Sequence, residues 1–184
     1  MDSVADMWLD LALCRRDATE IARALASLPP GRHSFWEGWA AYVRNDATSA
    51  ERAFTAARVE MEKVVREQPD DAEALSILAM IDAALGHKED ALREGRRAVE
   101  VLPVTKDAFS GAKLLANLAV IYTWVGEKDL AIKQLEEALR IPSDYSDVSY
   151  GALRLSPVWD PLRGDPRFEK LVEESKKPVV VEQL

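Results

Sequence analysis

The chain has 184 residues, of which 48% are hydrophobic and 30% are charged, and its formal net charge is −8. Such a length and composition are typical of one soluble domain or one short helical array with a buried core. Because nucleic-acid binding depends mainly on Lys and Arg that neutralise phosphates, the acidic balance argues against a nucleic-acid surface in this region.

Helix signals run along most of the chain, whereas strand signals are nearly absent. The apolar periodicity and the capping patterns predict helices at about 3–14, 17–28, 34–45, 48–67, 71–85, 88–101, 110–125 and 128–140. Three of these helices are expected to open with a capping box, which pairs Asp17 with Glu20, Thr48 with Glu51 and Asp70 with Glu73. The helices are expected to pair as hairpins over about 3–28, 34–67, 71–101 and 110–140.

A short pattern recurs four times along these predicted helices. It consists of a large apolar residue, a second one a helical turn later, and then an alanine. The four copies are Trp8, Leu11 and Ala12; Trp36, Trp39 and Ala40; Leu75, Leu78 and Ala79; and Leu115, Leu118 and Ala119. A repeat of this period predicts helical hairpins that stack on one another, and such arrays commonly offer extended binding surfaces.

The third and fourth copies resemble the tetratricopeptide repeat. The third copy supplies Leu75, Leu78, Ala79, Gly86, Ala91, Ala98 and Pro103, and the fourth supplies Leu115, Leu118, Ala119, Tyr122, Gly126, Ala131, Leu135, Ala138 and Pro142. The resemblance implies an all-α, right-handed superhelical array of antiparallel helix hairpins. Asp82 and Gly95 depart from the family pattern, and Asp82 stands where the family has an apolar residue, which suggests a local irregularity in the third hairpin.

The segment 143–176 is expected to cap the array. Ser-Pro and Asp-Pro pairs favour helix starts, and they predict short helices near 157–163 and 165–175. Trp159, Leu162, Phe168 and Leu171 would cover the last hairpin. This segment also resembles the end of tetratricopeptide arrays in large bacterial regulatory proteins that carry a winged-helix DNA-binding domain or a Ser/Thr kinase domain. The remaining residues, 177–184, form an apolar tail.

The resemblance further implies a concave groove lined by the first helix of each hairpin. The candidate groove residues are Ser76, Met80, Ala83, Lys113, Asn117, Val120 and Trp124. The family's clamp for a terminal carboxylate is not expected, because Met80 and Val120 occupy positions that the clamp needs. An apolar peptide or helix is the expected occupant of this groove.

No pattern in the chain predicts catalysis. The two histidines and the single cysteine, Cys14, do not form a zinc signature, and neither a phosphate-binding loop nor a nucleophile elbow occurs. Cys14 is expected to be a small buried residue. We therefore expect a protein that is not an enzyme, with no cofactor and no metal. The sequence lacks a signal peptide and an apolar run that could span a bilayer, so a soluble protein without membrane insertion is expected, with the cytoplasm favoured.

The function expected from these patterns is protein–protein interaction within a bacterial regulatory or signalling protein. Two alternatives remain open. The chain could self-associate into a homo-oligomer through Val179–Val181 or through the long helix at 48–67. It could instead sense a small molecule in a pocket between Trp36, Trp39 and the third hairpin. Trp36, Trp39 and Tyr42 share one helix face, which suits either core packing or the wall of a groove.

Overall fold

The computed structural model describes residues 4–28, 33–141 and 148–176, and every regular element in these ranges is helical. This confirms the prediction of an all-α chain for the described residues. The helices are α1 (Val4–Arg15), α2 (Ala18–Ala26), α3 (His33–Val43), α4 (Ala47–Glu67), α5 (Ala72–Ala84), α6 (Lys88–Val101), α7 (Ala108–Trp124), α8 (Lys128–Leu139), α9 (Tyr150–Leu155), the 3₁₀ helix η2 (Pro157–Leu162) and α10 (Pro166–Glu174). The predicted tail at 177–184 and the start of the predicted cap lie outside the described residues.

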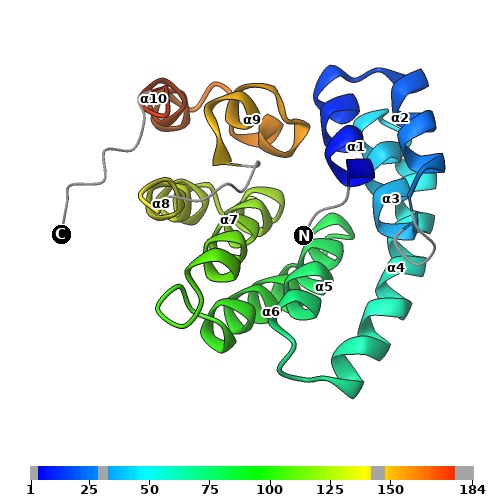
Figure 1. The fold of residues 1–184 in the computed structure, drawn as a ribbon, viewed down its shortest axis with the longest axis horizontal. Coiled ribbons are helices and arrows are strands. Elements are labelled where there is room, and N and C mark those ends of the chain that lie inside the picture. Colours follow the sequence, from blue (N-terminus) through cyan, green and yellow to red (C-terminus); the bar gives the residue numbers. More distant parts are fainter. Residues whose placement is uncertain (1–3, 29–32, 142–147, 177–184) are drawn as a thin grey trace.

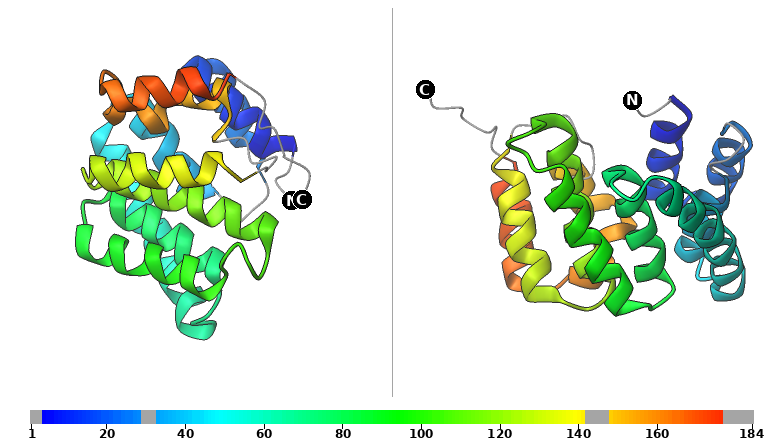
Figure 2. Two further views of the ribbon diagram at one scale, coloured as in Figure 1. Left: turned by 90° about the vertical axis from the view of Figure 1, so that its left-hand side faces the viewer. Right: turned by 90° about the horizontal axis from the view of Figure 1, so that it is seen from below.

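The helices follow one another around a ring. Within the first eight, α1 packs on α2, α3 on α4, α5 on α6 and α7 on α8. Neighbouring pairs are joined by contacts of α2 with α3, of α4 with α5 and of both α5 and α6 with α7. The last three helices then return toward the first, so that α9 contacts α1, as Figure 1 shows. In the left view of Figure 2, α8 lies between α10 and α7.

The alanines of the recurring pattern lie in the packed core. Ala12, Ala40, Ala79 and Ala119 are all buried. A methyl side chain lets two helix backbones approach closely, while the large residues of the pattern fill the space on either side. The two matched glycines, Gly86 and Gly126, both have φ of 81°, a backbone conformation that favours glycine and that reverses the chain after α5 and α7.

Two of the three predicted helix caps are wrong by one or two residues. Asp17 caps α2 by accepting hydrogen bonds from the backbone N–H groups of Thr19 and Glu20, as predicted. The other half of the predicted capping box is wrong, because the Glu20 carboxylate accepts from Trp8 and Arg23 and the N–H of Asp17 donates to Ala12. Helix α4 is capped by Asp46 rather than Thr48, because Asn45 adopts a positive φ of 59° and starts the helix earlier.

Helix α5 is capped by Asp71, whereas its neighbour Asp70 accepts from Arg97 at 3.0 Å. Because Asp70 and Asp71 are consecutive and both suit an N-cap, the sequence does not distinguish which of them caps α5.

The segment after α8 forms a helical cap, which we define as α9, η2 and α10. Helix α9 was not predicted, because six residues are too few for a periodic pattern. Trp159, Leu162 and Phe168 are fully buried and Leu171 nearly so. Helix α10 contacts α8 and η2 contacts α7, so these side chains lie against the last hairpin. None of the helices in the described part of the chain combines the length and the apolar composition needed to cross a membrane.

Candidate functional site

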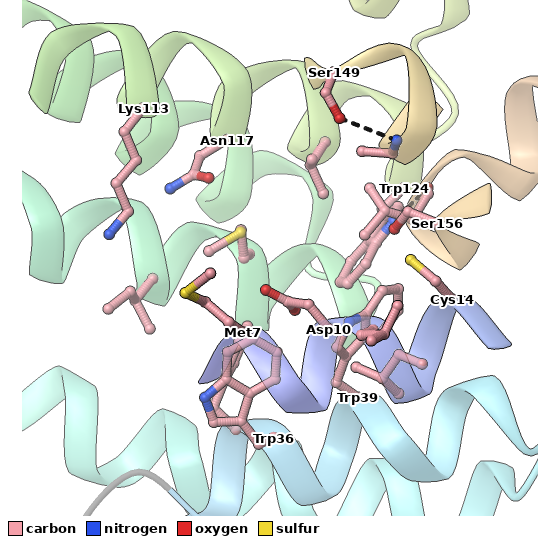
Figure 3. A pocket seen from close by; sticks show the side chains of 18 of the residues that line it. Met7, Asp10, Cys14, Trp36, Trp39, Lys113, Asn117, Trp124, Ser149 and Ser156 are labelled. Carbon is pink, nitrogen blue, oxygen red and sulfur yellow. Dashed lines mark hydrogen bonds between the residues drawn. The ribbon is translucent and has the colours of Figure 1, made fainter. Parts of the chain in front are cut away.

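A cavity of about 480 Å³ lies on the inner side of the ring. Its walls come from five places in the chain, namely α1, α3, α5, α7 and the helical cap, with one further residue from α4. The lining side chains are mainly apolar, and Figure 3 shows the tryptophan, methionine and polar groups around the space. This volume and this composition are typical of pockets that bind small organic molecules.

Helical periodicity places the pocket residues of each element on one face. On α7, Lys113, Asn117, Val120 and Trp124 recur every three or four residues and therefore form one stripe. On α5, Glu73, Ile77 and Met80 form the neighbouring stripe, and on α3 Trp36 and Trp39 are one turn apart. The spacing of three or four residues therefore identifies the face of each helix that lines the pocket.

Three of the five tryptophans of the chain line the pocket, at positions 36, 39 and 124. The rings of Trp39 and Trp124 lie 4.6 Å apart between centroids, and Tyr42 stacks on both at 5.2 and 5.8 Å. The indole N–H of Trp124 donates to the carbonyl oxygen of Val158 at 3.2 Å. The aromatic wall is therefore held in place both by stacking and by the helical cap.

The predicted groove residues separate into two groups. Met80, Lys113, Asn117, Val120 and Trp124 lie together on the pocket wall. Ser76 is buried and accepts a hydrogen bond from the amide of Asn117 at 2.9 Å. Ala83 is buried near the end of α5 among the packed residues of the third and fourth hairpins. Ser76 and Ala83 therefore support the wall and are not part of it.

The polar groups of the wall are partly neutralised within the pocket. The ammonium group of Lys113 lies 3.0 Å from the carboxylate of Glu73, across the gap between α7 and α5. Met80 and Val120 lie on the same wall and offer no hydrogen-bond donor.

Half of the pocket lining comes from helix α1 and the helical cap, where no candidate groove residue was predicted. Helix α1 contributes Met7, Asp10, Leu11, Leu13 and Cys14, and the cap contributes Ser149, Gly151, Ala152, Leu155, Ser156 and Val158. Cys14 is half-buried at this wall, so the expectation of a buried core cysteine is wrong. One feature of the sequence indicates that α1 has a second partner besides α2. This helix is apolar around most of its circumference, as expected of a helix that packs on two sides.

Helix α1 and the cap meet beside the pocket. The guanidinium of Arg16 lies 2.6 Å from the carboxylate of Asp160, and these residues are 144 positions apart in the chain. Helix α1 and the cap thus complete the wall of the pocket on this side. At its rim, Met7, Leu11 and Leu155 are large apolar side chains that remain more than half exposed. Exposed apolar groups that gather at one place commonly mark a binding surface.

A second polar cluster lies between α4, α5 and α6, away from the pocket. Asp82 is fully buried, and its Oδ1 atom accepts from Arg58 Nε at 2.6 Å and from His87 Nδ1 at 2.8 Å. Helix α5 is regular through this residue, so the predicted irregularity is wrong. His87 is therefore the partner of a buried carboxylate, although its own side chain is about half exposed.

Glu94 faces the same buried carboxylate. Burial, followed by the negative charge of Asp82, raises the pKa of Glu94 to about 7, although Arg93 opposes this effect from 3.2 Å. The Oδ2 atom of Asp82 and the Oε2 atom of Glu94 are buried and have no hydrogen-bond partner among the described residues. A protonated Glu94 can donate a hydrogen bond within the cluster, whereas an ionised one repels Asp82.

This arrangement predicts that stability falls as pH rises. Between about pH 4.5 and 7 the unfolded chain releases the proton of Glu94 while the folded chain keeps it, so the free energy of unfolding should drop. Because Glu94 is only partly buried, solvent screening reduces this drop to on the order of 2 kcal/mol. Glu94→Gln should remove this dependence and should be the more stable protein at pH 8. Urea unfolding followed by circular dichroism between pH 4 and 8 measures both effects.

Glu100→Gln is the matched control, because Glu100 is an exposed glutamate on the same helix. This control should keep the wild-type pH profile. If Glu94→Gln also keeps it, the carboxyl group of Glu94 does not carry a proton in the folded protein at neutral pH.

Comparison of the chain with protein-family models, with curated proteins and with solved structures found no match. Because a fold alone does not determine an activity, the function has to be argued from the pocket.

Proposed function

We propose that this chain is a non-catalytic binding module of the tetratricopeptide type, and that its pocket holds a small organic molecule with a largely apolar body. The tetratricopeptide assignment is supported by the recurring pattern, by the burial of its alanines and by the pairing of consecutive helices. A place within a bacterial regulatory or signalling protein is consistent with the resemblance of the C-terminal segment to the ends of such arrays. In that setting the module would act as the sensor.

One observation carries the choice of ligand, namely the size of the pocket. A single turn of α-helix with its side chains is 5.4 Å long and 10–12 Å across, and so occupies about 400–600 Å³. The pocket of about 480 Å³ is therefore comparable in size to one such turn. A small molecule uses such a space fully, whereas a partner helix would leave most of its length outside.

An apolar peptide from a partner protein remains a second candidate. It is favoured by the exposed apolar rim of Met7, Leu11 and Leu155, which a small molecule inside the pocket would cover only in part. In this alternative one or two side chains would enter the pocket and the rest of the peptide would bury the rim. The self-association expected through the tail falls on residues outside the described ranges, and light scattering at several concentrations would test it.

The test of pocket binding uses neopentylbenzene, a compact neutral hydrocarbon. We expect saturable quenching of tryptophan fluorescence and a higher melting temperature, because a ligand that binds only the folded state stabilises it. Met80→Glu should weaken binding at least about tenfold, since the new carboxylate would have to lose its water beside an apolar ligand. Leu11→Glu should weaken it less, because Leu11 lies at the rim.

Val59→Glu provides the control, because Val59 is an equally exposed apolar residue that does not line the pocket. It should bind the probe within about twofold of the wild type, as surface substitutions away from a site usually have small effects. Equal binding by all four proteins, each checked for native helicity, would remove the pocket as the binding site.

A further inference from the structure

The aromatic side chains around the pocket form more than an apolar lining. Trp36, Trp39 and Trp124 come from two helices, and Phe35 adds a fourth ring that lies edge-on to Trp36 at 5.4 Å. The face of an aromatic ring carries negative potential, and the indole ring has the strongest attraction for cations. Several such rings around one space are the usual means by which proteins bind quaternary ammonium groups.

The charged side chains of the described lining also favour a cation over an anion. The described lining residues contain two carboxylates, Asp10 and Glu73, and one ammonium group, Lys113. Lys113 and Glu73 lie 3.0 Å apart and form an ion pair, and Asp10 is the second carboxylate of the described lining. Figure 3 shows the carboxylate of Asp10 directed from α1 toward the middle of the cavity. Whatever else Asp10 contacts in the protein, its charge favours a cation in this half-buried, apolar setting.

We propose that the ligand is an organic cation, an amine or quaternary ammonium with an apolar body, which places its charge among the tryptophan rings near Asp10. This inference rests on the proposed function, since it names the ligand class of the same pocket. The net charge of −8 acts in the same direction, because it raises the concentration of cations near the protein. An anionic ligand would face Asp10 and would have to displace Glu73 from Lys113.

The test compares two probes of the same shape. Benzyltrimethylammonium and neopentylbenzene differ only in having a cationic nitrogen or a neutral carbon at the branch point. We expect the dissociation constant of the cation to be at least about tenfold lower, as measured by tryptophan fluorescence at low salt, because cation–π attraction and a nearby carboxylate act together.

Two substitutions assign this preference to its sources. Asp10→Asn should reduce the preference for the cation by about fivefold or more, with little change for neopentylbenzene. Trp36→Leu should weaken the cation more than the neutral probe. The control is Asp70→Asn, which removes the same charge from an exposed position outside the pocket and should keep the preference within about twofold.

The outcomes separate this inference from the proposed function. If neopentylbenzene binds as tightly as the cation, the ligand class is wrong while the pocket remains a binding site. If neither probe binds to the folded wild-type chain, both proposals fail. A cation preference that Asp10→Asn leaves unchanged would also overturn the inference as stated.

Discussion

Trp159→Ala should lower the free energy of unfolding by about 3–5 kcal/mol, the usual cost of truncating a fully buried aromatic side chain. Trp159 lies in η2 with none of its surface exposed, and its ring packs 6.3 Å from that of Phe168 in α10. It therefore joins two helices of the cap. Urea unfolding followed by circular dichroism would measure the loss.

The same substitution should also weaken probe binding in the pocket. The neighbouring residue, Val158, lines the pocket and accepts the hydrogen bond from Trp124. A cavity under η2 would let Val158 and Trp124 move.

The matched control for the effect on stability is Leu155→Ala, because Leu155 lies in the same cap and is more than half exposed. It should change the free energy of unfolding by no more than about 0.5 kcal/mol. A loss below about 1 kcal/mol for Trp159→Ala would show that the helical cap does not stabilise the ring of helices.

Arg58→Met should be similarly destabilising, by about 3–5 kcal/mol, because it leaves the carboxylate of Asp82 buried without its cationic partner. Arg58 reaches from α4 to Asp82 in α5 at 2.6 Å, and it also pairs with Glu62 at 2.6 Å. The interaction thus connects the second hairpin to the third. Thermal and urea unfolding at pH 8 would measure the effect.

A double variant separates the cost of an unpaired charge from the loss of packing. Arg58→Met combined with Asp82→Leu removes both charges, and buried ion pairs can often be replaced by apolar residues without loss of stability. We expect this variant to recover most of the lost free energy. Arg52→Met, an exposed arginine on the same helix, serves as the control and should be nearly neutral. If the double variant is as unstable as Arg58→Met alone, the charge of Asp82 is not the cause.

The sequence predicted the parts of the fold that depend on local periodicity. The recurring alanines, such as Ala79 and Ala119, mark positions where helices must come close, and such positions can be recognised without knowing the partner helix. The five groove residues that line the pocket follow from the same periodicity on α5 and α7. Ser76 and Ala83 are buried and do not line the pocket, because a stripe predicts a helix face and not which of its members a neighbouring helix will cover.

The closure of the ring could not be predicted. It depends on contacts between residues far apart in the chain, such as Arg16 and Asp160, and no local pattern encodes them. The buried Asp82 was likewise misjudged, since its partners Arg58 and His87 come from a different helix and from a turn. A polar residue at an apolar position was visible in the sequence, but the charges that compensate it were not.

The most direct test of the pocket as a binding site uses its methionines. Met7, Met61 and Met80 all line the cavity, from three different helices. In a chain labelled with ¹³C at the methionine methyl groups, a titration with benzyltrimethylammonium or neopentylbenzene should shift the signals of all three residues with one common dissociation constant. Signals that stay in place while a probe binds elsewhere, or that show no saturable shift with either probe, would contradict the account.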